Sequence, residues 1–284
     1  MNISNTLEYH IEQSINLARL VQKNFNYNYD GMASVSCKLD ENAMIMLPNT
    51  YNDNNKFDNI VLDYQRIINH LLRPISEYNS DYYNFLNSCV LGKNKLNNYD
   101  AGIHSLCNRY VLHSHSIYVA MLVCTKEGQK IAQQLFPNSI WVPYKMNGIM
   151  LDHTIKYSLL DNNVNIIYLQ NHGIIVQSNN AQDVYELHNK INLKIRDHFE
   201  LFRTFTPQQE IWDIDWFNKN IILEHQIYAI DEYTENNKSK TVSNILCACN
   251  FILKHILTAN LTPNILSKES VDLYKNHMSI KCAL

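Results

Sequence analysis

Two histidines, His113 and His115, are separated by a single residue in the segment RYVLHSHSIYVAML, residues 109–122. Most of the other residues in this segment are Val, Leu, Ile, Tyr and Ala, which favours a buried β-strand. Side chains two positions apart on a strand leave the same face, so both imidazoles would project into one space. There they could repel, stack or bind one metal ion, or they could be two unrelated polar positions near a strand end.

A third histidine, His172, lies in the segment YLQNHGIIVQ at a predicted junction between a strand and a turn. Gly173 follows it, and glycine allows a tight turn and a close approach of the backbone to a site. Three histidines from two strand regions can form the three-ligand shell of a catalytic zinc site and leave a position open for substrate. The chain has 12 histidines, so this spacing alone is a weak signal, and surface or packed polar roles remain alternatives.

Composition restricts the class of protein. The chain has 284 residues, of which 46% are hydrophobic, enough for one large core or for a core with an appended subdomain. The 24 basic and 27 acidic residues give a net charge of -3 without a basic field, which argues against binding to nucleic acid or to an anionic membrane. The seven cysteines are irregularly spaced, as expected for free thiols in a reducing compartment. Without a leader-like start or a long apolar run, we expect a cytoplasmic protein.

The pattern of apolar residues predicts alternating strands and helices. We expect a helix at the start, a hairpin near residue 40, and a strand and helix that break near Pro74. After residue 100 the expected order is helix 101–109, strand 110–124, helix 126–136, strand 139–144, helix 152–161, strands 164–170 and 174–178 around the turn NHG, and a long helix from about Asn180. Residues 1–206 would form a metal-binding domain. Residues 207–284 would form a helical C-terminal extension, either a subdomain or part of the same domain.

The chain from Gly31 to Phe199 resembles the class II aldolase/adducin family. The strongest segments are DAGIHSLCNRYVLHSHSIYVA, WVPYKMNGIML and IIYLQNHGIIVQSNNAQDVYELH, and they are most similar to the aldolase domains of bifunctional aldolase/dehydrogenase proteins. In this family an acidic residue precedes a helix, an HxH pair follows, and a later NHG supplies the third histidine. The resemblance therefore implies that His113, His115 and His172 hold Zn²⁺ or another divalent first-row metal. It implies that Asp100, in place of the usual Glu, transfers the proton.

The resemblance to fuculose- and rhamnulose-phosphate aldolases also implies a fold and a reaction. The expected fold is a three-layer α/β/α arrangement with a central, predominantly antiparallel sheet, and its metal site at the sheet edge. The expected reaction is aldol or retro-aldol chemistry on a sugar-derived hydroxycarbonyl through a metal-bound enediolate, as part of carbohydrate metabolism. Alternatives on the same scaffold are a sugar-phosphate 4-epimerase, a dehydratase or a decarboxylase. A non-catalytic, adducin-like interaction module is a further alternative. Relatives form homotetramers, so the resemblance implies a homo-oligomer.

The segments that bind phosphate in the family are altered in this chain. The corresponding residues are Gly31-Met32-Ala33-Ser34, Asn49-Thr50 and Asn98-Tyr99, of which only Gly31 and Ser34 keep the family pattern. Tyr99 is too large to replace a serine without reshaping the pocket. We therefore expect a substrate that is unphosphorylated, anchored differently, or a larger activated sugar. The predicted substrate-binding residues are Gly31, Ser34, Asn49, Asn98, Tyr99, Tyr144 and Asn171.

Several of these residues also have simpler structural interpretations. Asp100 could be the N-cap of the helix that follows it. His104, four residues later, could contact Asp100 across one helical turn or be a packed polar residue. The cysteines Cys247 and Cys249 lack a second pair and fit best as core thiols.

Overall fold

The computed structural model describes residues 3–47, 59–74, 81–96, 100–160, 163–201, 205, 213–234 and 239–282. The predicted substrate-binding positions Asn49, Asn98 and Tyr99 lie outside these ranges. The described strands form one sheet of seven in the order β3-β2-β1-β4-β7-β6-β5. Only β5 and β6 pair in parallel, and the other neighbouring strands are antiparallel. The strands are β1 (Ser34–Lys38), β2 (Ala43–Leu47), β3 (Ile60–Asp63), β4 (Tyr110–Ser114), β5 (Ile140–Val142), β6 (Ile166–Leu169) and β7 (Gly173–Ser178).

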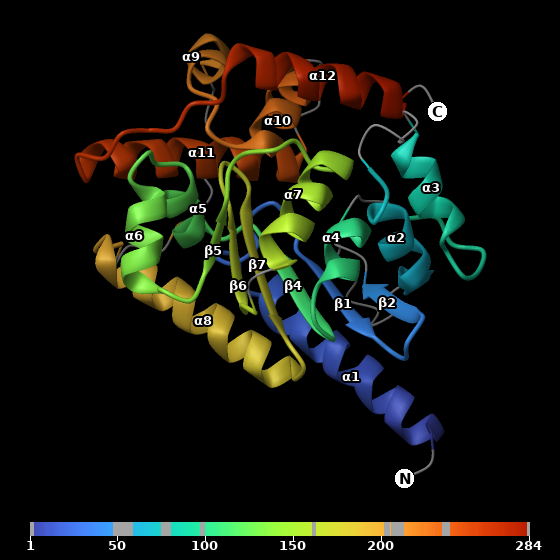
Figure 1. The fold of residues 1–284 in the computed structure, drawn as a ribbon. Coiled ribbons are helices and arrows are strands. Elements are labelled where there is room, and N and C mark those ends of the chain that lie inside the picture. Colours follow the sequence, from blue (N-terminus) through green and yellow to red (C-terminus); the bar gives the residue numbers. More distant parts are fainter. Residues whose placement is uncertain are drawn as a thin grey trace.

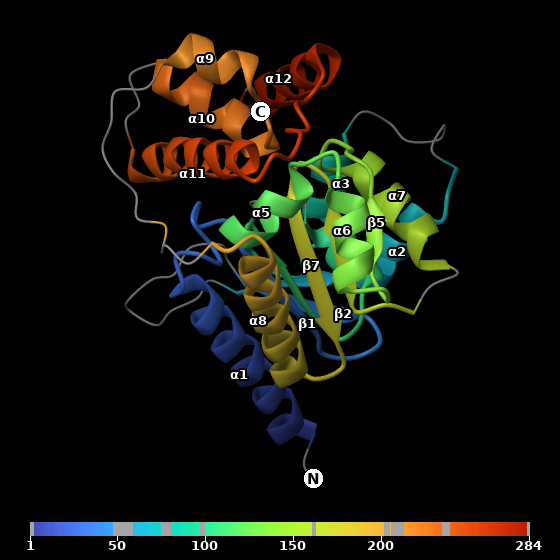
Figure 2. The ribbon, with the colours of Figure 1, turned by 90° about the vertical axis from the view of Figure 1, so that its left-hand side faces the viewer.

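Helices cover both faces of this sheet. The helices before residue 200 are α1 (Ile3–Gln22), α2 (Tyr64–Leu71), α3 (Tyr82–Ser88), α4 (Ala101–Leu106), α5 (Ile117–Val123), α6 (Gly128–Leu135), α7 (Ile149–Leu160) and α8 (Ala181–His198). Helices α1 and α8 pack together on one face, whereas α2, α4 and α7 lie on the other (Figures 1 and 2). The predicted three-layer α/β/α fold with a predominantly antiparallel sheet is therefore confirmed.

The central strands alternate their side chains between two separate hydrophobic clusters. On β4, Tyr110 and Leu112 join the cluster shared with α1, α5 and α8, and Val111 joins the cluster under α4 and α7. Such alternation is the normal consequence of the two-residue period of a strand. His113 continues the series on the same face as Val111, and so it points toward α4. The register of β4 therefore decides which side of the sheet receives the first histidine.

The segment 110–124 differs from its prediction as a single strand. β4 ends at Ser114, and residues 117–123 form α5, with the Ser116 side chain accepting a hydrogen bond from the backbone N–H of Tyr118 as the N-cap. All seven residues of α5 are buried, so the helix has no polar face and its apolar run has no helical period. A short, fully buried apolar run does not distinguish a strand from a helix. His115 consequently lies just beyond the strand.

Within the described residues after 205, four helices follow the α/β part of the chain: α9 (Ile214–Lys219), α10 (Glu224–Thr234), α11 (Lys240–Thr258) and α12 (Lys268–Cys282). They gather at one end of the sheet (Figures 1 and 2). Buried side chains of α9, α10 and α11 join the same cluster as α1, α5 and α8, and partly buried side chains of α12 pack against it. By length and composition α11 could cross a membrane, but half of its most apolar window is buried and it packs on α5 and α10, as a core helix does. Cys247 and Cys249 on α11 are buried in the main hydrophobic cluster, as predicted for core thiols.

Candidate metal centre

The three predicted histidines meet in the interior. His113, His115 and His172 are 2%, 5% and 6% exposed, and their ring centroids are 4.8–5.1 Å apart. Each offers one nitrogen, and these three nitrogens lie within 4.8 Å of one another. His113 comes from the end of β4 and His172 from the turn between β6 and β7. Since β4 and β7 are neighbours in the middle of the strand order, the site lies at the ends of central strands, and its prediction at the sheet edge was wrong.

The turn that carries His172 depends on two unusual backbone positions. Asn171 has φ of 56°, in the left-handed region that Asn tolerates better than most residues. At Gly173 a Cβ atom would lie 2.5 Å from the carbonyl oxygen of Ser114 and 2.8 Å from Cδ2 of His115. Gly173 therefore lets the start of β7 approach the end of β4 closely enough for His172 to meet His115.

A carboxylate fixes each histidine of the HxH pair. Nδ1 of His113 lies 3.0 Å from Oδ2 of Asp100, and Nδ1 of His115 lies 2.5 Å from Oδ2 of Asp30. The opposite nitrogens, Nε2 of both rings, are buried and have no partner within the described part of the chain. Metal-ligating histidines characteristically donate their second ring N–H to a carboxylate, which fixes the tautomer and the ring orientation. The donor set and these unpartnered nitrogens therefore fit a divalent metal such as zinc.

The electrostatic environment differs between His172 and His115. Burial is the main reason why the pKa of His172 lies well below its usual value, and the neighbouring His113 and His115 lower it further. His172 is therefore neutral at physiological pH. Nδ1 of His172 is also buried and unpartnered among the described residues. Burial alone would raise the pKa of Asp30, but the adjacent His115 and His225 and a backbone hydrogen bond from Met32 lower it to about 2. Burial lowers the pKa of His115, but the neighbouring Asp30 outweighs burial and raises this pKa.

Asp100 lies beside the centre but both of its oxygens are engaged. Oδ2 accepts hydrogen bonds from His113 and, at 2.6 Å, from the Ser34 hydroxyl, and Oδ1 lies 3.4 Å from Nδ2 of Asn147. Burial opposes ionisation, yet His113, His104 and Ser34 hold the pKa of Asp100 well below its usual range. Asp100 occupies the N-cap position of α4, as the simpler interpretation expected, but its side chain makes no cap hydrogen bond to that helix. His104 is fully buried and bonds to the hydroxyls of Ser34 and Ser36.

On the side of the C-terminal helices, three further buried polar atoms have no partner among the described residues. They are the hydroxyl of Tyr144, Oδ1 of Asn147 and Oε2 of Glu224. Burial raises the pKa of Glu224 to about 7, although the backbone N–H of Asn147 and the nearby Tyr144 hydroxyl act in the opposite direction. Because buried polar groups are normally satisfied, this group of atoms indicates the side from which a polar ligand would be bound.

Several predicted substrate-binding residues have other tasks in the structure. The hydroxyl of Ser34 is fully buried and donates to Asp100 at 2.6 Å. The side-chain amide of Asn171 bonds to the backbone carbonyls of Ile222 and Asn264 and to the side chain of Asn264. Gly31 is exposed, with φ of 75° in the turn after Asp30. Of the described candidates, Tyr144 alone presents an unpartnered atom near the centre.

Sequence reasoning missed Asp30, Glu224 and His225. His225 stacks on His115 with a centroid distance of 4.9 Å, and its Nε2 lies 2.6 Å from the Tyr29 hydroxyl and 3.9 Å from Asp30. Asp30 is also hydrogen-bonded to His115, so Asp30, His225 and Tyr29 form a positioning network around the His115 ring. A signal existed for two of them, because the pair Glu224-His225 directly follows the apolar run IIL, where polar residues are drawn into the core.

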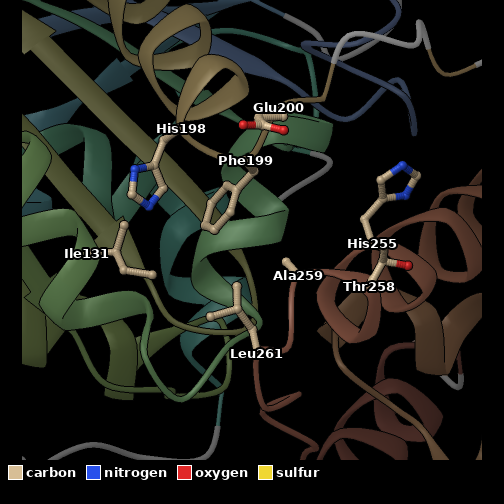
Figure 3. A pocket seen from close by; sticks show the side chains of 8 residues that line it. All are labelled: Ile131, His198, Phe199, Glu200, His255, Thr258, Ala259 and Leu261. Carbon is tan, nitrogen blue, oxygen red and sulfur yellow. The ribbon is translucent and has the colours of Figure 1, made fainter.

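A separate pocket lies away from this centre. Its volume is about 470 Å³, and it opens between the C-terminal ends of α8 and α11 (Figure 3). The lining residues include Ile131, His198, Phe199, Glu200, His255 and Leu261. None of the three converging histidines borders it, so we assign it no part in the metal centre.

Comparison with known proteins identifies the fold. No protein-family model matches the sequence, and no curated protein sequence matches it either. The N-terminal class II aldolase domain of a conserved protein from Thermoplasma acidophilum superposes with a TM-score of 0.57 at 14% identity, over 66% of this chain and 92% of that one. The chain thus has the fold of a class II aldolase domain. Two other superpositions are an L-fuculose 1-phosphate aldolase from Glaciozyma antarctica PI12 (TM-score 0.46, 12% identity, 91% and 93% of the two chains) and a sugar-phosphate aldolase from Thermotoga maritima (0.45, 12%, 69% and 98%).

Proposed function

We propose that this chain, which has the class II aldolase fold, is a metal-dependent lyase that performs aldol or retro-aldol chemistry on a sugar-derived hydroxycarbonyl compound. One observation carries the proposal. Three buried imidazoles converge with unpartnered nitrogens, and two of them are held from behind by carboxylates. A purely structural cluster would not leave several buried nitrogens unsatisfied, because each such atom costs about 1–3 kcal/mol. A non-catalytic, adducin-like module has no need of this arrangement.

The residues that would hold the ion are His113, His115 and His172, and zinc is the first candidate among divalent first-row metals. When bound, the ion would act as a Lewis acid at the substrate oxygens and stabilise the negative charge that develops as the carbon-carbon bond breaks. Asp30 and Asp100 orient the rings of His115 and His113, so that Nε2 of each ring points into the shared space. The burial of all three rings keeps bulk water from the reacting atoms.

The polar atoms next to the centre favour a hydroxylated substrate without a simple phosphate anchor. Tyr144 and Asn147 each offer one unpartnered oxygen, a hydroxyl and an amide carbonyl, which suit the hydroxyl groups of a sugar. Ser34 is committed to Asp100 and His104 and does not serve a phosphate. We therefore propose an unphosphorylated, differently anchored or nucleotide-linked sugar, acted on in the cytoplasm by a homo-oligomer.

A substrate screen tests this proposal. Zinc-loaded protein would be incubated with phosphorylated, free and nucleotide-linked sugars, with aldehyde release and isomer formation both recorded. Aldehyde release from at least one compound supports the lyase. Isomer formation without aldehyde would reassign the chain to a 4-epimerase, and loss of water or carbon dioxide would reassign it to a dehydratase or decarboxylase. Efficient cleavage of a simple ketose 1-phosphate would contradict the altered substrate anchor.

A further inference from the structure

The reaction needs a group that moves a proton at the substrate, and Asp100 is poorly placed for it. Its Oδ2 is shared by His113 and Ser34, and its Oδ1 faces the amide of Asn147. A general acid or base needs a free lone pair or proton within reach of the reacting atom. These contacts make Asp100 a positioning residue, in the same relation to His113 that Asp30 has to His115.

Glu224 is a second buried carboxyl group next to the same centre. It is 5% exposed, and its Oε1 accepts a hydrogen bond from the backbone N–H of Asn147 at 3.3 Å. Its Oε2 accepts no hydrogen bond of normal geometry within the described residues, and the Tyr144 hydroxyl lies close to the carboxyl group. It is close enough to the centre for the charges of His115 and Asp100 to act on its carboxyl group. A buried carboxyl oxygen that is left unpaired beside a cluster of free imidazole nitrogens is available to a ligand in that space.

The C-terminal segment holds Glu224 in this place through several independent contacts. The residues before it, Ile222 and Leu223, are fully buried in the main core. The backbone N–H of Glu224 donates to the carbonyl of Asn171 at 3.1 Å, directly beside His172. The Asn171 side chain in turn donates to the carbonyl of Ile222 at 2.7 Å. The turn that carries the third histidine and the start of α10 are therefore one connected unit.

Asn147 links the two carboxyl groups. Its backbone N–H is bound to Glu224, while its side-chain amide faces Asp100. Burial raises the pKa of Glu224 to about 7. The oxygens of Asp100 are instead engaged by His113, Ser34 and Asn147. Two carboxyl groups in such different environments commonly divide the work of a site, one as proton carrier and one as a fixed charge.

We infer that Glu224, delivered by the C-terminal helices, is the proton-transferring group of the proposed reaction, and that Asp100 positions His113. The inference rests on the proposed function. In the cleavage direction the Glu224 carboxylate removes the proton from the hydroxyl group whose carbon becomes the aldehyde carbon. The electron pair of the broken carbon-carbon bond stays with the ketone fragment. The Glu224 carboxylic acid then returns its proton to the carbon of the ketone fragment that kept this electron pair, which regenerates the carboxylate and balances the reaction.

The test compares Glu224→Gln with Asp100→Asn, and Glu269→Gln serves as the control. Glu269 is an exposed glutamate in the first turn of α12 and is outside the site. Zinc affinity is measured first by competition with a chelating dye. We expect wild-type affinity for Glu224→Gln and for Glu269→Gln. For Asp100→Asn we expect a weakening of roughly 10–100-fold, the usual effect of removing the partner of a histidine ligand.

The second readout is solvent-deuterium exchange at carbon in zinc-loaded protein, with dihydroxyacetone and dihydroxyacetone phosphate as probes. We expect Glu224→Gln to slow exchange by about 100-fold or more at full zinc occupancy. Formate added to Glu224→Ala should restore part of the rate, which loss of a merely structural contact would not permit. Wild-type exchange in zinc-loaded Glu224→Gln would overturn the inference, as would loss of exchange in fully loaded Asp100→Asn alone. If the wild type binds zinc but exchanges neither probe and cleaves no sugar, the proposed function fails and the inference fails with it.

Discussion

The replacement of Asp30 by Asn examines the support behind His115. Asp30 is fully buried, and its Oδ2 lies 2.5 Å from Nδ1 of His115. Asn keeps the size and the acceptor oxygen, so the change removes the charge and leaves the shape. Burial opposes the ionised form of Asp30, but His115 and the other contacts lower its pKa from 3.8 to about 2. That difference corresponds to about 2 kcal/mol of folding stability.

The sign of this contribution follows from the direction of the shift. A carboxyl group with a depressed pKa stabilises the folded state above its unfolded pKa, and this stability is lost as the pH falls from about 4 toward 2. At pH 7 the free energy of unfolding of metal-free Asp30→Asn, measured by urea titration, should therefore be about 2 kcal/mol lower than that of the wild type. The difference should shrink below pH 4.

The same substitution should also weaken the binding of the metal. A histidine ligand that loses the carboxylate behind it binds zinc about 10–100-fold more weakly, equal to about 1.4–2.7 kcal/mol. Competition with a chelating dye measures this effect directly. Asp215→Asn, an exposed position on α9, serves as the control and should change neither quantity. If Asp30→Asn binds zinc with wild-type affinity, the reasoning that Asp30 orients His115 as a ligand is refuted.

Three further predictions follow from the site. Gly173→Ala places a Cβ atom 2.5 Å from the carbonyl oxygen of Ser114. The free energy of unfolding should therefore fall by about 1–3 kcal/mol, and zinc affinity should fall with it. Wild-type values for both would show that the close approach of β7 to β4 is not needed. Burial raises the pKa of Glu224 to about 7, so its ionisation lowers the stability of the folded state as the pH rises above about 4.5. Metal-free Glu224→Gln should therefore be more stable than the wild type at pH 8, by about 3 kcal/mol at most, but not at pH 4.5. Equal urea midpoints of the two proteins at both pH values would contradict this. Tyr144→Phe removes a buried hydroxyl beside the Glu224 carboxyl group, which the ring itself does not need for packing. Zinc content should stay unchanged while KM for the sugar found in the screen rises; an unchanged KM would exclude Tyr144 as a substrate contact.

The parts of the site that depend on local pattern were predictable from the sequence. The spacing of His113 and His115 and the NHG turn at His172 are readable within a few residues, and the structure brings the three rings together. The alternation of strands and helices was predictable for the same reason. The exception is α5, whose fully buried apolar residues show no period that separates a helix from a strand.

The partners of the histidines were not predictable, because they depend on tertiary packing. Asp30 and His115 are 85 residues apart in sequence, and their contact follows from how the chain before β1 packs beside the end of β4. Glu224 reaches the centre from the C-terminal helices through contacts with Asn171 and Asn147. Neither interaction has a characteristic spacing. Ser34 and Asn171 show the opposite case, in which a short motif marked residues that the fold uses for positioning.

The central claim is that three buried histidines hold a metal ion, and metal analysis tests it most directly. Wild-type protein and His172→Ala, both purified without chelator, would be analysed for first-row metals. His172 is chosen because it lies in the turn between β6 and β7 and its ring bonds to neither Asp30 nor Asp100. We predict about one zinc or similar divalent ion per wild-type chain and a large loss in the folded variant. X-ray absorption of the wild type should show nitrogen ligands at about 2.0–2.1 Å. A wild-type protein that contains no metal and takes up none when zinc is supplied would contradict the account.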